Sequence, residues 1–181
     1  MNRCRTVGYL FLIGLTLWGC SGIQTPSNSV WIAQPDFFEV DNHLLNVRIE
    51  PKKGEYPYYV FFLLTLANKS NDDLIVDWNA SEYLFNGKPQ GVLVFEGIDP
   101  ASVKNAMVPP QTVAPGAVLS LEIMPMRLIA WSPIKEKTAG GRSISPGMFP
   151  VGENGIRMAV RHENGLITIP LSVRISREGA P

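Results

Sequence analysis

Two histidines and two groups of acidic and amide residues could supply metal ligands in this sequence. His43 and His162 each stand in or beside a polar turn, and neither has a cysteine or second histidine at the close spacing of a zinc site. Asp41-Asn42 and Asn71-Asp72-Asp73 could offer oxygen ligands to calcium, but neither follows the D-x-[DN]-x-[DN]-G pattern of a calcium loop. We therefore expect solvent-exposed turn histidines, turn-forming acids and no bound metal or cofactor.

Nucleophilic catalysis has little support in the same sequence. No G-x-S-x-G motif is present, and Ser132 to Lys135 matches S-x-x-K without its S-D-N and K-T-G companions. Residues 139–143 are glycine-rich but lack the frame of a phosphate-binding loop. A glycosidase needs two carboxylates that the fold brings together, so the sequence leaves this alternative open. We expect a protein that is not an enzyme, with a cryptic hydrolase as the alternative.

The remaining reactive residue is Cys20, and its chemistry depends on the segment that precedes it. Arg3 and Arg5 make the N-terminus positive, and an uncharged apolar run of about twelve residues follows at 7–18. A helix needs about twenty apolar residues to cross a bilayer core of roughly 30 Å, so this run is short for a membrane span. A basic start followed by a short apolar run is typical of a signal peptide.

The segment Leu17-Trp18-Gly19-Cys20 resembles the lipobox of bacterial lipoproteins, with Trp18 larger than the small residue usual at its position. The resemblance implies that residues 1–19 are a lipoprotein signal peptide and that Cys20 is acylated, which would anchor the chain in a lipid bilayer. The residue directly after Cys20 is Ser21, and not an aspartate. By the family's sorting rule in Gram-negative bacteria, this favours the periplasmic leaflet of the outer membrane. An ordinary secretory signal or an uncleaved anchor is the alternative.

Loss of the signal peptide would change the charge and the cysteine count. The full sequence has 16 Lys and Arg against 16 Asp and Glu; without Arg3 and Arg5, 14 basic residues face 16 acidic ones, a net charge of about −2. This near-neutral balance does not indicate nucleic-acid binding. Cys4 would leave with the signal and Cys20 would be acylated, so no disulfide could form. A single domain of about 150 residues can be held by its core alone.

The composition after Cys20 predicts a tether followed by one β domain. Residues 20–29 are polar, and we expect them to form a lipidated N-terminus and a flexible tether. Residues 30–178 alternate apolar and polar residues with a period of two, broken early at Pro35. The run at 58–67 is apolar on both faces, as in a central strand that is covered on both sides.

Turn residues predict how the strands are joined. Asn86-Gly87 favours a type I′ hairpin between strands at 82–85 and 92–95, although Pro89 and Gly91 suggest a longer loop or a bulge. Asn164-Gly165 predicts the turn of the last hairpin. Pro170 cannot donate a backbone hydrogen bond, so the last strand should lie at a sheet edge or be bulged there.

About seven to nine short strands with regular turn signals indicate an all-β, antiparallel β-sandwich. Two segments resemble Ig-like domains of bacterial surface and periplasmic proteins. The first is residues 61–78, in which a strand is followed by an Asn-rich turn and a second strand, and the other is Val113-Ala114-Pro115-Gly116. The resemblance implies an Ig-like sandwich in which Trp78 could belong to the core.

Residues 132–154 form a stretch dense in Pro, Gly and Ser, and loops of that length are usually functional or disordered. Its apolar residues Ile134, Met148 and Phe149 are candidates for binding a partner. The sequence therefore suggests a membrane-anchored envelope lipoprotein whose domain binds another envelope protein through this loop or an exposed edge strand. The alternative is a module that binds a small ligand or a glycan.

Overall fold

The computed structural model describes residues 29–95, 98, 108–132, 143–163 and 165–179, which form antiparallel β-strands and one short 3-10 helix, η1 (Met126–Leu128). The all-β class expected from the sequence is confirmed. The strands are β1 (Val30–Gln34), β2 (Phe38–Asp41), β3 (Leu45–Lys52), β4 (Phe61–Asn68), β5 (Leu74–Val76), β6 (Glu82–Phe85), β7 (Lys88–Pro89), β8 (Leu93–Phe95), β9 (Gln111–Val113), β10 (Val118–Pro125), β11 (Ala130–Ser132), β12 (Ser143–Ser145), β13 (Gly152–His162) and β14 (Gly165–Glu178). None of the described residues belongs to a helix with the length and hydropathy needed to span a bilayer.

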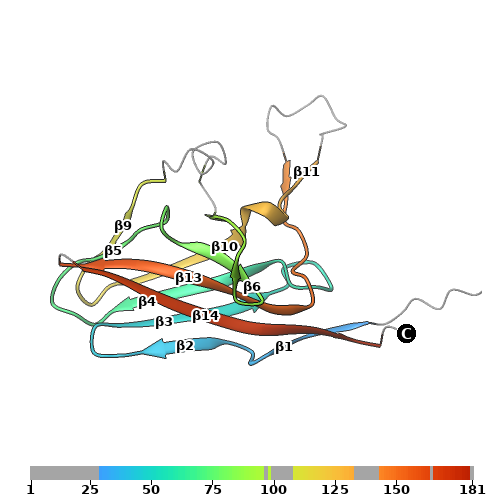
Figure 1. The fold of residues 1–181 in the computed structure, drawn as a ribbon, viewed down its shortest axis with the longest axis horizontal. Coiled ribbons are helices and arrows are strands. Elements are labelled where there is room, and N and C mark those ends of the chain that lie inside the picture. The colour runs from blue at the N-terminus through green and yellow to red at the C-terminus, as the bar shows by residue number, and fades with distance from the viewer. Residues whose placement is uncertain (1–28, 96–97, 99–107, 133–142, 164, 180–181) are drawn as a thin grey trace, which may run out of the picture.

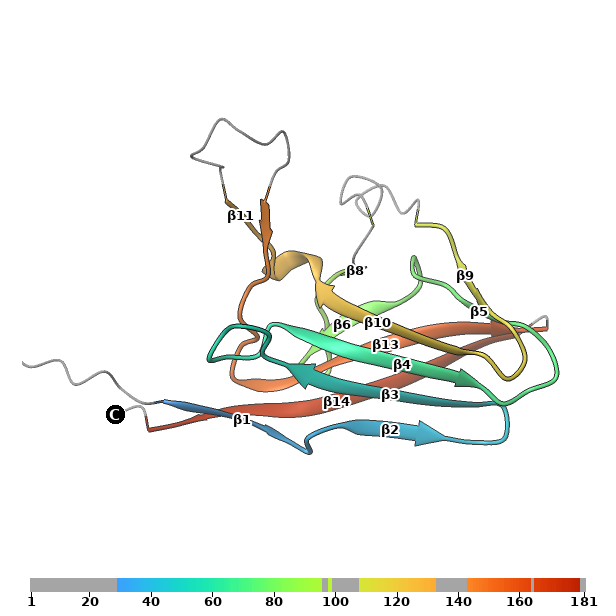
Figure 2. The same ribbon diagram turned by 180° about the vertical axis from the view of Figure 1, so that it is seen from behind.

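The strands form two main antiparallel sheets. The first has the order β1-β14-β13-β5-β9, with β6 also paired to β13 and β7 paired to β6. The second has the order β2-β3-β4-β10-β8, and β11 pairs with β12 separately. Figure 1 shows the long β13–β14 pair in front of β3 and β4, and Figure 2 shows the second sheet from the other side. The strand number exceeds the expected seven to nine because several strands are short segments.

The N-terminal strand crosses from one sheet to the other at Pro35. β1 pairs with the end of β14, whereas β2 pairs with β3. The break expected at Pro35 is therefore present, and it joins the two sheets into one curled antiparallel arrangement.

Alternating apolar residues of both sheets meet in one core. β3 and β4 are buried at every second residue, with the intervening side chains only partly covered. The fully buried side chains include Leu45, Val47 and Ile49 of β3, Phe62, Leu64 and Leu66 of β4, and Ile156, Met158 and Val160 of β13. Burying one such side chain contributes about 1.5–3 kcal/mol. β4 is central, between β3 and β10, as predicted, but only one of its faces is fully buried.

The first predicted hairpin turn is present with a different return strand. Asn86 and Gly87 have φ angles of 49° and 72°, as a type I′ turn requires. The strand that returns from the turn is β7, of two residues, and not the predicted 92–95 segment. β8 pairs instead with β10 in the other sheet, because the chain crosses over after Gly91, whose φ is 109°.

The last hairpin is confirmed, with its turn displaced by one residue. His162 pairs with Gly165, so Gly165 belongs to the strand and the turn begins at Glu163. Pro170 pairs with Arg157 on β13, and β1 covers only the 174–178 part of β14. Pro170 therefore lies on the open part of the strand, at the edge position expected of a proline.

Candidate functional site

The segment that contains the predicted partner-binding residues is partly core. Phe149 has no exposed surface, and its ring centroid lies 4.6 Å from that of Phe62 and 6.2 Å from that of Tyr83. Its backbone N–H donates to the Tyr59 carbonyl over 2.8 Å. Phe149 is thus a core residue and not a surface contact, because the segment folds back onto the sheets. Met148 is 45% exposed, and Ile134 and Cys20 lie outside the described residues.

A buried polar network holds this segment in place. Asn154 has no exposed surface; its Nδ2 donates to the carbonyls of Pro150 (2.8 Å) and Gly152 (3.1 Å), and its Oδ1 accepts from the Tyr83 hydroxyl. Burial raises the pKa of Tyr83, so the hydroxyl keeps its proton and can donate. The network fixes the backbone on which Met148 and Val151, 54% exposed, face solvent.

The chain enters and leaves the domain at the same end. Val30, the first residue of β1, pairs with Glu178 at the end of β14 (Figure 1). The following residue, Trp31, packs edge-on against Tyr58 at 6.3 Å, and the Lys53 Nζ donates to the Trp31 carbonyl over 2.9 Å. These contacts fasten the first strand to the body of the domain.

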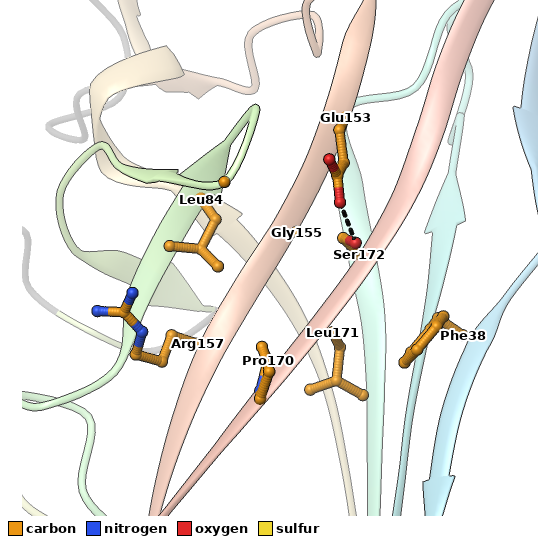
Figure 3. Close-up of a pocket in the computed structure, with 9 residues that line it drawn as sticks. Phe38, Leu84, Glu153, Gly155, Arg157, Pro170, Leu171 and Ser172 are labelled. Atoms are coloured by element: carbon orange, nitrogen blue, oxygen red, sulfur yellow. Dashed lines mark hydrogen bonds between the residues drawn. The ribbon is translucent and has the colours of Figure 1, made fainter.

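A hollow of about 360 Å³ lies over β13 and β14 and includes the open edge at Pro170 (Figure 3). Its lining contains one carboxylate, Glu153, which accepts a hydrogen bond from the Ser172 hydroxyl, and Arg157, which is paired with Glu82. Acid–base hydrolysis of glycosides uses two facing carboxylates. Because one carboxylate lines this hollow, its geometry does not favour the hydrolase alternative.

The partly buried ion pair between Asp77 and Arg161 has a structural role. Burial acts to raise the pKa of Asp77, but hydrogen bonds from Arg161 and from the backbone N–H groups of Ala80 and Asn79 lower it below its ordinary value. The Arg161 Nε lies 3.1 Å from Asp77 Oδ2. The Asp77 carboxylate is therefore charged at neutral pH. Its ion pair with Arg161 links the segment that follows β5 to strand β13.

The structure brings together three side chains that sequence reasoning kept apart: Asp72, His162 and Glu163. Each offers one ligand atom, and these atoms all lie within 4.8 Å of one another. His162 ends β13, and its backbone pairs with Leu74, two residues after Asp72. The sequence could not reveal this proximity, because it depends on the register of β5 against β13.

His162 differs from the expected exposed turn histidine. Its side chain is 16% exposed, and its Nε2 is buried with no hydrogen-bond partner in the part of the chain that the structure describes, 3.8 Å from Asp72 Oδ2. His43, in contrast, is exposed as predicted. A buried nitrogen without a hydrogen-bond partner lowers the stability of the fold by about 1–3 kcal/mol. A ligand that binds this nitrogen could recover that loss.

Comparison of the chain with models of protein families, with curated proteins and with solved structures finds no match. The functional proposals below therefore rest on the residues of this chain.

Proposed function

We propose that this chain is a lipid-anchored protein of a bacterial cell envelope whose β domain is a non-catalytic module that binds another envelope protein. The observation that carries the proposal is the order of features before Val30. Two arginines, a short apolar run, the segment Leu17-Trp18-Gly19-Cys20 and a polar stretch follow one another up to the first strand. Ser21 supports placement in the periplasmic leaflet of the outer membrane.

We also propose that the domain is an Ig-like β-sandwich. Two features support it. The first strand is divided between two antiparallel sheets at Pro35, and Trp78 is buried with 2% of its surface exposed.

The binding surface we favour is the outer side of the 146–151 segment. Met148 and Val151 are large apolar side chains that remain exposed on a backbone held by Phe149 and Asn154. Large exposed apolar side chains on a fixed backbone favour a protein contact, because little conformational entropy is lost on binding. Strand addition at the open edge of β14 is less suited, since Pro170 offers no N–H there.

We expect Cys20→Ser to abolish incorporation of labelled palmitate and to release the protein from membranes, because the acyl chains would have no attachment atom. The measurement is palmitate labelling in cells, followed by fractionation of membranes and soluble material. Cys4→Ser is the matched control, since Cys4 lies in the proposed signal peptide, and it should label like the parent. Persistent labelling of Cys20→Ser would contradict the lipid anchor.

We expect a photo-crosslinking amino acid at position 148 to form an adduct with one envelope protein in intact cells. The same amino acid at position 166 is the control, because Leu166 is also apolar and is 55% exposed, on the last hairpin. Point replacement is needed, since deletion of residues 132–154 would remove Phe149 and Asn154 from the core. Identical adducts from both positions, or none from position 148, would argue against this binding surface.

A further inference from the structure

The geometry points to a zinc-class metal site formed by Asp72, His162 and Glu163. The ligand atoms of these three side chains lie within 4.8 Å of one another. The site belongs to a different part of the domain from the 146–151 surface, and the inference does not depend on lipid anchoring.

The state of His162 is the observation that points to a ligand. Its Nε2 is buried and has no hydrogen-bond partner among the described residues, and it lies 3.8 Å from Asp72 Oδ2. That distance is too long for a hydrogen bond. Around a tetrahedral zinc, ligand atoms lie about 3.3–3.6 Å apart, given metal–ligand bonds of about 2.0–2.2 Å. The His162–Asp72 pair is within a few tenths of an ångström of this spacing, and all three ligand atoms lie within 4.8 Å of one another, so movement of the exposed Asp72 and Glu163 side chains would bring them onto one ion.

The backbone positions of two of the ligands are fixed by the fold. His162 is in the β13 ladder, paired with both Leu74 and Gly165. The Asp72 carbonyl accepts from the Nδ2 of Asn68, 2.8 Å away, and that nearly buried amide also donates to the Val113 carbonyl. Binding an ion would therefore require movement of the side chains and not of the backbone at these two positions.

The donor set selects the kind of metal. One imidazole nitrogen and two carboxylate oxygens suit zinc and neighbouring divalent transition metals, whereas calcium and magnesium prefer oxygen ligands alone. Three protein ligands leave one tetrahedral position for water or for a group from a partner. The site assigned here is therefore an open zinc site.

The test is equilibrium dialysis of the purified full chain, in detergent, against zinc alone. The chain carries Cys4→Ser and Cys20→Ser, so that no thiol contributes to binding. We expect one zinc per chain, not displaced by excess calcium, and a rise of several degrees in the thermal unfolding midpoint at saturating zinc. Asp72→Asn, His162→Ala and Glu163→Gln should each weaken binding at least about tenfold, since even changes around metal ligands cost 10–100-fold.

His43→Ala is the matched control, because His43 is an exposed turn histidine outside the cluster, and it should bind zinc like the parent. Asp72 and Glu163 are exposed, so their variants test the site without disturbing the core. No saturable zinc binding, displacement of zinc by calcium, or parent-like affinity in His162→Ala or in both carboxylate variants would overturn the inference.

Discussion

Gly155→Ala should lower the thermal unfolding midpoint by about 6–12 °C, for a loss of about 3 kcal/mol in the free energy of unfolding. A Cβ on Gly155 would lie 2.2 Å from the Leu171 carbonyl oxygen and 2.9 Å from the Ser172 Cα. Both atoms belong to the backbone of β14, which cannot rotate away as a side chain could. The paired strands would have to separate locally, at the place where the domain has its longest ladder.

Gly165→Ala is the matched control for this prediction. Gly165 lies on the same hairpin, and its nearest atom to an added Cβ is the His162 carbonyl oxygen at 3.7 Å, an ordinary contact. Removing a glycine from a position that alanine can adopt stabilises a protein by about 0.4–1 kcal/mol. Circular dichroism melts of the two full-length variants in detergent make the comparison. Equal midpoints would show that β13 and β14 do not approach as closely as described.

Phe149→Ala should cost about 3–5 kcal/mol of stability, the range found when a buried aromatic side chain is removed. The cavity would open between Phe62 and Tyr83, against which the Phe149 ring packs. The surrounding strands are held in register by their ladders, so we expect them to collapse only partly into the space. A loss of that size is a large fraction of the 5–15 kcal/mol that stabilises a typical domain.

Met148→Ala is the control beside it, and it should change stability by less than about 0.5 kcal/mol because the side chain is largely in solvent. Urea unfolding of both variants measures the difference. The comparison also separates two roles for Phe149, since a residue used only to contact a partner would leave the stability of the free domain unchanged. Parent-like unfolding of Phe149→Ala would therefore restore it as a surface candidate.

Local features of the fold could be predicted from the sequence, because their causes lie within a few residues. Asn86 and Gly87 accept the positive φ angles of their turn, and the proline at position 170 lies at an open edge. Alternation in β3 correctly marks which side chains enter the core.

Features that depend on pairing between distant segments could not be predicted. Nothing local to β8 indicates that it leaves β6 and β7 to join β10 in the other sheet. Phe149 lies among Pro and Gly residues, which have no regular apolar–polar alternation. The sequence there does not indicate whether an apolar side chain is exposed or buried. The approach of Asp72 to His162 requires the β5–β13 register, which brings together residues 90 positions apart in the sequence.

The pairing of Val30 with Glu178 places the start of β1 beside the end of the longest strand of the described residues, β14. β14 has 14 residues, and at about 3.3 Å per residue it is roughly 45 Å long. Its first residue, Gly165, pairs with His162, so the Asp72–His162–Glu163 cluster lies at the opposite end of this strand from Val30. A chain anchored through Cys20 could therefore hold that cluster tens of ångströms from the lipid headgroups.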